Sequence, residues 1–185
     1  LVNLIIAPFR APKSAKVYQK VWTQNGSPLK YYGEQNQKVL QAKLGDNFEV
    51  KLAMRYQNPS LKKELAIFKK QGMTKIIVVP MFPQYASATT GSVMELVMAE
   101  IATWQIIPEI KLINAFYDNP KYIQGFVDNA KKIMKDQNFE HYLFSYHGLP
   151  ERRIHKGDYH QKICKLGSCC DSIVADNQFC YRAQC

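Results

Sequence analysis

Cysteine is missing from most of the chain. None occurs in residues 1–163, and all five cysteines lie between Cys164 and Cys185 of the 185 residues. A disulfide framework distributes its bridges over a whole fold, so this clustering argues against one here. It favours a local metal site instead.

Long hydrophobic runs are lacking too. The most apolar stretch, residues 76–83, contains Pro80 and is far shorter than the roughly 20 residues that a transmembrane helix needs. The chain begins Leu-Val-Asn and has no secretory signal pattern. We therefore expect a cytoplasmic protein without a membrane-spanning helix, and a chain that is a piece of a longer gene product.

Acidic residues are scarce relative to basic ones. Asp and Glu number 15 against 25 Lys and Arg, which gives a formal charge of +10. Such an excess favours anionic partners, namely nucleic acid, an acidic membrane surface or a carboxylate-bearing ligand. No basic stripe with interleaved aromatic residues is present, which argues against nucleic acid. Peripheral contact with anionic lipid is a further expectation.

The order of apolar and turn-forming residues predicts helices that alternate with short strands. Ser60 is expected to cap a helix, Gly45 and Gly72 to end helices, and Ser92 with Glu95 to form a capping box. The alternation predicts an α/β fold, a Rossmann-like parallel sheet with helices on both faces. The expected helices cover residues 14–22, 33–44, 60–71, 92–101 and 122–134, and the expected strands cover residues 48–54, 75–79, 110–116 and 142–146.

Ligands of such sheets bind beyond the carboxyl ends of the strands. The informative loops are therefore those after Met54, Val79, Phe116 and Tyr146. The last loop begins with His147, whose imidazole can bind a metal or accept a proton near neutral pH. A histidine at a strand end fits a structural hydrogen bond equally well.

Several motifs in these loops resemble the ferrochelatase family. Residues 80–85 read Pro-Met-Phe-Pro-Gln-Tyr, and they are followed by Thr-Thr-Gly-Ser at 89–92, Ser-Tyr-His-Gly-Leu-Pro at 145–150 and Gly-Asp at 157–158. Matching segments upstream, in the family's order, are residues 9–13, 26–29, 54–56 and 58–60. The resemblance implies a lyase that inserts Fe²⁺ into a porphyrin in haem biosynthesis. It also implies that this chelatase-like domain is one of two.

The resemblance also implies roles for particular residues. His147 would lie in the porphyrin cleft, as the base for the pyrrole protons or as a ligand that delivers the substrate Fe²⁺. A neutral imidazole suits either task. The implied porphyrin-binding residues, which combine propionate anchors with aromatic walls, are Arg10, Lys13, Tyr18, Ser27, Arg55, Phe82 and Tyr85. The competing interpretation makes Arg10 and Lys13 surface cations and Ser27 a turn residue.

The chain departs from the family pattern in two respects. Phe82 stands where many relatives have a tyrosine proposed to guide iron, and phenylalanine has no oxygen for that role. It would be porphyrin wall or core instead. The family pattern also starts upstream with an Asn-Leu-Gly-Thr-Pro strand and continues into a second domain with an essential glutamate. Neither segment is in these residues, so we expect the isolated chain to be inactive or nearly so.

The five cysteines follow the pattern C-x4-C-C-x9-C-x4-C. Four thiolates could enclose a [2Fe–2S] cluster or a tetrahedral zinc ion, and spacing alone does not separate the two. Gly167 and Ser168 would allow a tight loop. Resemblance to bacterial ferrochelatases with an internal centre favours iron–sulfur. Because structural metal sites contribute folding energy directly, we expect the centre to order residues 160–185 rather than to perform the insertion chemistry. The candidate ligands are Cys164, Cys169, Cys170, Cys180 and Cys185, with the spare thiol expected in the adjacent pair, His155 and His160 as weaker substitutes, and unligated thiols as the alternative.

The expected organisation has two parts. An α/β domain incomplete at its N-terminus covers residues 1–160, a thiol-rich metal segment covers residues 161–185, and the second catalytic domain is absent. A non-catalytic porphyrin- or haem-binding module, or an iron–sulfur redox sensor, is the competing interpretation. Chelatases for cobalt or nickel share the general fold, but the Thr-Thr-Gly-Ser and His-Gly-Leu-Pro motifs favour the iron enzyme.

Overall fold

The computed structural model describes residues 7–135, 137–165 and 168–185. The chain divides into two compact units, Leu1–Glu64 and Leu65–Cys185, and each is described by itself. Gly167, which we expected in a tight loop, lies outside the described residues.

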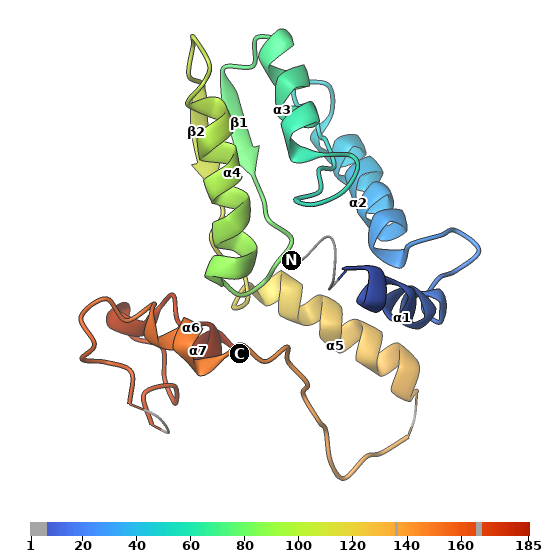
Figure 1. The fold of residues 1–185 in the computed structure, drawn as a ribbon. Coiled ribbons are helices and arrows are strands. Elements are labelled where there is room, and N and C mark those ends of the chain that lie inside the picture. The colour runs from blue at the N-terminus through green and yellow to red at the C-terminus, as the bar shows by residue number, and fades with distance from the viewer. Residues whose placement is uncertain (1–6, 136, 166–167) are drawn as a thin grey trace. The chain divides into compact units, whose positions relative to one another are not determined.

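The first unit opens with two helices, α1 (Ala7–Gln19) and α2 (Pro28–Leu44) (Figure 1). Both begin earlier in the chain than predicted. Pro28 occupies the first turn of α2, where its fixed φ suits a helix and its missing N–H costs nothing. The expected stop is confirmed, because Gly45 takes φ 71°, a conformation that favours glycine.

The predicted strand over residues 48–54 is wrong. Side-chain amides of α2 bind its backbone instead: Gln41 Nε2 donates to the Phe48 carbonyl at 2.9 Å, and Gln41 Oε1 accepts from the Val50 amide at 2.8 Å. Gln37 Nε2 donates to the Val50 carbonyl at 2.9 Å. Backbone groups satisfied by a helix need no neighbouring strand, and the segment forms only an isolated parallel bridge, between Met54 and Ser60.

Helix α3 (Leu61–Lys70) is as predicted. The Ser60 hydroxyl accepts from the Lys63 amide at 3.4 Å, and Gly72 follows the helix with φ 67°.

A parallel pair of strands forms the sheet of the second unit. Strand β1 (Lys75–Val78) pairs with β2 (Glu109–Leu112), with Ile76 opposite Ile110. An ion pair of 2.7 Å between Lys75 and Glu109 closes one end of the pair. The α/β class with parallel strands is confirmed. Among the described residues the sheet has two strands where four were expected.

Helix α4 (Ser92–Ile101) runs along the β1–β2 pair (Figure 1). A π-helical turn, η2 (Ser87–Gly91), leads directly into it. The expected capping box of Ser92 and Glu95 is wrong, because the N-cap residue is Gly91 and it makes no side-chain cap. The buried apolar residues of this unit are Leu65, Ile76, Ala86, Met94, Val97, Ile101 and Trp104.

The rest of the second unit is helical or irregular. Helix α5 (Pro120–Met134) is capped by Asn119, whose side chain accepts from the amides of Lys121 and Tyr122. Three short elements follow: α6 (Glu151–His155), η3 (Ala175–Asn177) and α7 (Tyr181–Gln184). No helix in the described part of the chain is long and apolar enough to cross a membrane.

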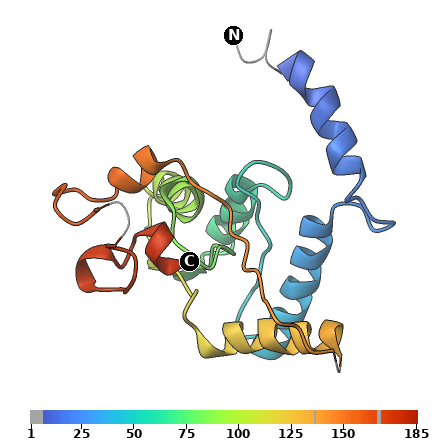
Figure 2. The ribbon, with the colours of Figure 1, turned by 90° about the horizontal axis from the view of Figure 1, so that it is seen from below.

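The predicted strand over residues 142–146 is also wrong. Residues 137–150 run as an extended trace beyond α5, without ladder partners (Figure 2). Leu143 is 96% exposed and Phe144 79% exposed, so neither lies on a buried strand face. An alternating apolar pattern supplies strand propensity, but a strand also needs a neighbour.

Candidate functional site

The carboxyl ends of the two strands meet at one edge of the sheet. The Ile113 amide donates to the Val78 carbonyl at 3.0 Å, and the Phe116 amide donates to the Pro83 carbonyl at 2.9 Å. The loops after β1 and β2 are therefore bonded to each other. This is the edge at which the sheet rule expects a ligand.

Tyr85, in the loop after β1, is held from three sides. Its amide donates to Gln184 Oε1 at 2.6 Å, and its ring packs edge-on against Phe179 with centroids 5.6 Å apart. A Cβ on Gly91 would come within 3.2 Å of the Tyr85 hydroxyl, so the absence of a side chain at Gly91 makes room for it. The position of Tyr85 is thus set in part by groups distant in the sequence.

Phe82 in the same loop is 41% exposed, which disagrees with a core role. The ring is available to form part of a wall beside a flat apolar ligand.

His147 is exposed, and no strand precedes it. Its carbonyl accepts a hydrogen bond of 2.8 Å from the Tyr181 hydroxyl. The imidazole is therefore not buried in packed core, and its backbone is fixed by a side chain of α7.

A row of aromatic rings lies near Tyr146, the residue that precedes this histidine. Phe116 and Tyr122 pack edge-on at 5.2 Å, and Tyr122 and Phe126 do so at 5.0 Å. Burial raises the pKa of Tyr122, and nearby Tyr146 raises it further. The sequence pattern indicated only that Tyr122 and Phe126 share one face of a helix, and their link to Tyr146 was missed.

The remaining predicted porphyrin residues belong to the first unit. Arg10, Lys13 and Tyr18 lie exposed on α1, and Ser27 precedes α2 without a side-chain cap. The guanidinium of Arg55 lies 4.8 Å from the centre of the Tyr56 ring, a cation–π arrangement. The structure places these residues in a different unit from His147 and Tyr85.

The cysteine segment folds around the thiol of Cys169. The Lys165 amide donates to Cys169 Sγ at 3.2 Å, and this thiol donates to the Lys165 carbonyl at 3.0 Å. The sulfurs of Cys169 and Cys170 are 3.7 Å apart. Cys164 interacts with Cys169 and with Cys180, so these four thiols gather in one region.

The thiols differ in how readily they ionise. Burial, then a hydrogen bond with Cys169, raises the pKa of Cys170 to about 11. Burial also acts to raise the pKa of Cys169, but hydrogen bonds from Cys170 and from the Lys165 amide outweigh it, and this pKa is lowered. Burial is the main cause of the raised pKa of Cys164, and nearby Cys169 adds to it.

Two polar side chains order this segment: Asn177, which lies in no quoted motif, and Asp158, which lies in the Gly-Asp motif but was given no role. The buried amide of Asn177 donates to the carbonyls of Cys169 and Ser172, both at 2.8 Å, and accepts from the Val174 amide at 2.7 Å. Asp158 Oδ2 accepts from the amides of Ile163 and Cys164, both at 2.8 Å. Neither role follows from residue spacing, because each depends on a loop closing back on the chain.

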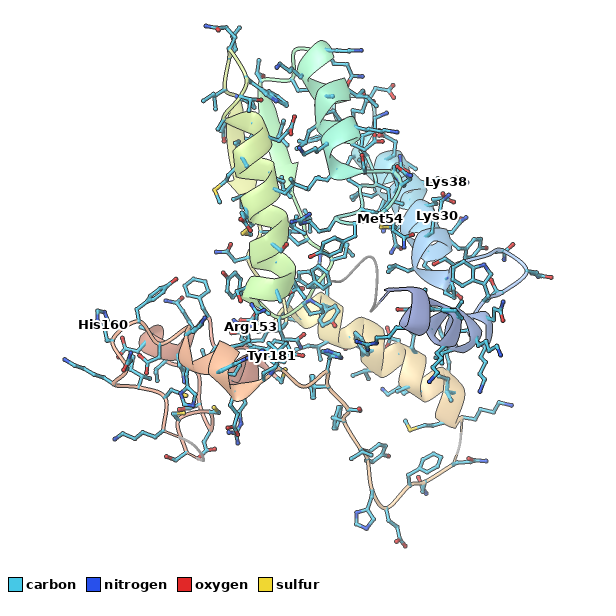
Figure 3. All side chains as sticks on the ribbon, in the orientation of Figure 1. Lys30, Lys38, Met54, Arg153, His160 and Tyr181 are labelled. Atoms are coloured by element: carbon cyan, nitrogen blue, oxygen red, sulfur yellow. The ribbon has the colours of Figure 1, made fainter. Side chains whose placement is uncertain are left out.

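The donor set fits a metal centre in its chemistry, but its present geometry is not that of a bound ion. All five cysteines are free thiols, and four are partly buried. No group of three potential ligands in the described residues is already arranged to hold a metal. Figure 3 shows His160 at the outer edge of the cysteine segment, while Tyr181 projects from α7.

The fold and this site define a parallel α/β protein in which loops at the carboxyl edge of the sheet contact a thiol-rich segment. A family model described as Ferrochelatase matches residues 1–185, and the chain belongs to the ferrochelatase family. It is 46% identical over 185 residues to a ferrochelatase of Legionella pneumophila subsp. pneumophila (strain Philadelphia 1), covering all of this chain and 54% of the relative. It is 39% identical over 185 residues to one of Coxiella burnetii (strain RSA 493), covering all of this chain and 51% of that relative. The chain thus spans about half the length of these curated relatives.

Proposed function

We propose that the gene product containing this chain inserts Fe²⁺ into a porphyrin in haem biosynthesis. The observation that carries the proposal is the family match over residues 1–185, in which His147 is an exposed residue whose carbonyl is bonded to α7. Relatives of about twice this length carry the name of the activity. The isolated chain is proposed to be inactive or nearly so.

In this proposal, His147 serves the step in which the porphyrin loses its protons. Insertion of Fe²⁺ replaces two pyrrole N–H protons, and a neutral imidazole can accept a proton or offer its nitrogen to the incoming ion. Being exposed, His147 can be reached by a ligand without unfolding. Either role requires the imidazole to stand next to the ring nitrogens.

Binding of the porphyrin is assigned to two kinds of side chain. Phe82 and Tyr85 offer aromatic surface to the flat ring, and the Tyr85 amide and ring are both held in place. Arg10, Lys13, Tyr18, Ser27 and Arg55 are proposed to serve the propionates and the inner wall, as the family resemblance implies.

The proposed resident metal centre is a [2Fe–2S] cluster held by four of the five cysteines, with zinc as the alternative. When bound, such a centre contributes folding energy to the loop that holds it. Asn177 and Asp158 already draw this loop together through five hydrogen bonds. Iron and sulfide analysis with visible absorption of anaerobically purified protein tests this. Colourless protein with one zinc ion and no iron would discard the iron–sulfur version.

The cellular location proposed is the cytoplasm, with peripheral contact to anionic lipid driven by the charge of +10. Co-sedimentation with phosphatidylserine vesicles tests it. Binding that is absent at low salt contradicts the membrane contact.

The test of the enzymatic proposal uses the full-length gene product with porphyrin and Fe²⁺ under anaerobic conditions. His147→Ala is expected to lower kcat by about 100-fold or more, the usual contribution of a general base. His141→Ala is the matched control, because His141 is also exposed and lies in the same extended segment. Equal activity of the two variants contradicts the role of His147. Porphyrin binding without metallation by the unaltered protein would favour the binding-module alternative.

A further inference from the structure

The cysteine segment is bonded directly to both His147 and Tyr85, residues assigned to the porphyrin site in the second unit. Helix α7 is flanked by Cys180 and Cys185, two of the candidate metal ligands. From this short helix, Tyr181 reaches the His147 carbonyl and Gln184 reaches the Tyr85 amide. One element between two thiols therefore touches two loops that are far apart in sequence.

The contact with Tyr85 is made by a buried side chain whose polar atoms are both hydrogen-bonded. Gln184 is only 6% exposed, and its side-chain amide uses both of its polar atoms. Oε1 accepts from Tyr85, and Nε2 donates to the Gln178 carbonyl. A buried amide with both atoms satisfied is held in one orientation, because any rotation would leave a polar group unpaired. Phe179 adds a ring contact to Tyr85 from the same stretch of chain.

The contact with His147 is a single hydrogen bond of 2.8 Å from the Tyr181 hydroxyl. It matters because residues 137–150 have no strand partner that could fix their backbone. The phenol of Tyr181 also interacts with the Cys185 thiol. A path of two contacts thus runs from a candidate metal ligand to the backbone of His147.

We propose that Tyr181 and Gln184 are positioning residues through which the folded cysteine segment sets the backbone of His147 and of Tyr85. Neither residue is assigned to contact the substrate. The importance of this placement for metallation rests on the proposed function, whereas the placement itself does not. Loss of order in the cysteine segment would then release both loops together.

The first test does not depend on activity. The full-length gene product is labelled with ¹³C,¹⁵N-histidine, and the His147 signals are identified by their loss in His147→Gln. Tyr181→Phe, which removes one hydroxyl, is expected to shift or broaden the His147 signals. Tyr159→Phe removes the same atom from a residue that is 92% exposed in the same part of the chain, and it should leave them unchanged. Identical His147 signals in the two variants would overturn the proposal for Tyr181.

The corresponding test of Gln184 follows the backbone amide of Tyr85 in protein labelled with ¹⁵N-tyrosine. This signal is identified by its loss in Tyr85→Phe. It should move in Gln184→Met, because the amide loses its acceptor, and stay in place in Gln105→Met, a matched change at an exposed position. An unmoved signal in Gln184→Met would overturn the proposal for Gln184.

A second test separates the two contacts by kinetics in the full-length gene product. Tyr181→Phe should lower kcat about fivefold, because one ordinary hydrogen bond contributes about that factor, and it should change porphyrin KM little. Gln184→Met should chiefly raise porphyrin KM by a similar factor, because it releases Tyr85. Gln105→Met again serves as the control.

Thermal denaturation and metal content are measured on the same samples. A general loss of folded protein would lower the apparent kcat of both variants and leave porphyrin KM unchanged in both, so an unchanged KM in Gln184→Met contradicts positioning, and a fall in kcat of Tyr181→Phe that matches its loss of folded protein does so too. If the unaltered gene product fails to metallate porphyrin, the proposed function falls, while the histidine and tyrosine spectra still decide whether Tyr181 and Gln184 position the two loops.

Discussion

Replacement of Asn177 by alanine tests whether one buried amide holds the cysteine loop together. Its side chain is 8% exposed and makes three hydrogen bonds, to the carbonyls of Cys169 and Ser172 and from the Val174 amide. An ordinary hydrogen bond contributes about 1 kcal/mol net, so all three together contribute about 3 kcal/mol. Ser172 and Val174 are exposed, so water can replace part of what they lose. We expect a net cost of about 2 kcal/mol to the local stability of the loop.

Hydrogen exchange measures this loss where it occurs. A local cost of about 2 kcal/mol speeds exchange of the loop amides about 30-fold, while amides of α4 keep their protection. The control is Gln178→Ala, which removes one exposed hydrogen bond of 3.0 Å to the Ala175 carbonyl from the adjacent position. Metal content of the two variants gives a second readout. Equal exchange rates and equal metal content in Asn177→Ala and Gln178→Ala would refute the reasoning.

Three further predictions concern stability and the Tyr85 loop. Hydrogen bonds from the amides of Cys164 and then Ile163 lower the pKa of Asp158 from its ordinary 3.8, so the stability that Asp158 contributes is complete above pH 3.8 and is lost as the pH falls below it. Hydrogen exchange of the Cys164 amide should accelerate at that low pH, and unchanged exchange in Asp158→Ala would contradict the role of Asp158 in ordering the loop. The Thr90 hydroxyl is fully buried with no hydrogen-bond partner among the described residues, so Thr90→Val should raise the free energy of unfolding by about 1 kcal/mol in urea titration, and a decrease would mean that the hydroxyl is satisfied. Gly91 has φ −58°, which alanine adopts easily, so Gly91→Ala should raise the thermal midpoint. It should also weaken porphyrin binding, because the new Cβ would lie 3.2 Å from the Tyr85 hydroxyl, and unchanged porphyrin affinity would argue against Tyr85 as a porphyrin contact.

Local signals in the sequence predicted helices well. Ser60 with Gly72 delimited α3, and Gly45 ended α2, because capping and left-handed backbone depend on residues within one turn. The bounds of α4 agree with the prediction, but its capping box was wrong because the chain enters the helix through a π-helical turn.

Strands were predicted less well, since a strand requires a partner that its own residues do not specify. Residues 75–78 pair with β2, whereas the backbone of residues 48–50 binds a side-chain amide of α2 and residues 142–146 have no strand partner. All three segments carried the apolar residues expected of a strand. What differed was the nonlocal environment.

The same distinction explains which parts of the site were visible in the sequence. His147, Tyr85 and the cysteines lie in motifs, so residue order alone identifies them as candidates. Tyr181 and Gln184 carry no motif, because their importance comes from contacts with residues 34 and 99 positions away.

A cysteine cluster in this position has a physical consequence for the sheet edge. The segment that holds His147 has no strand neighbour, whereas the loop that holds Tyr85 is also bonded to the loop after β2, and α7 adds one hydrogen bond to each of them. Any metal that stabilises residues 168–185 must also favour the bonded arrangement of His147 and Tyr85, because both hydrogen bonds exist only when α7 is formed.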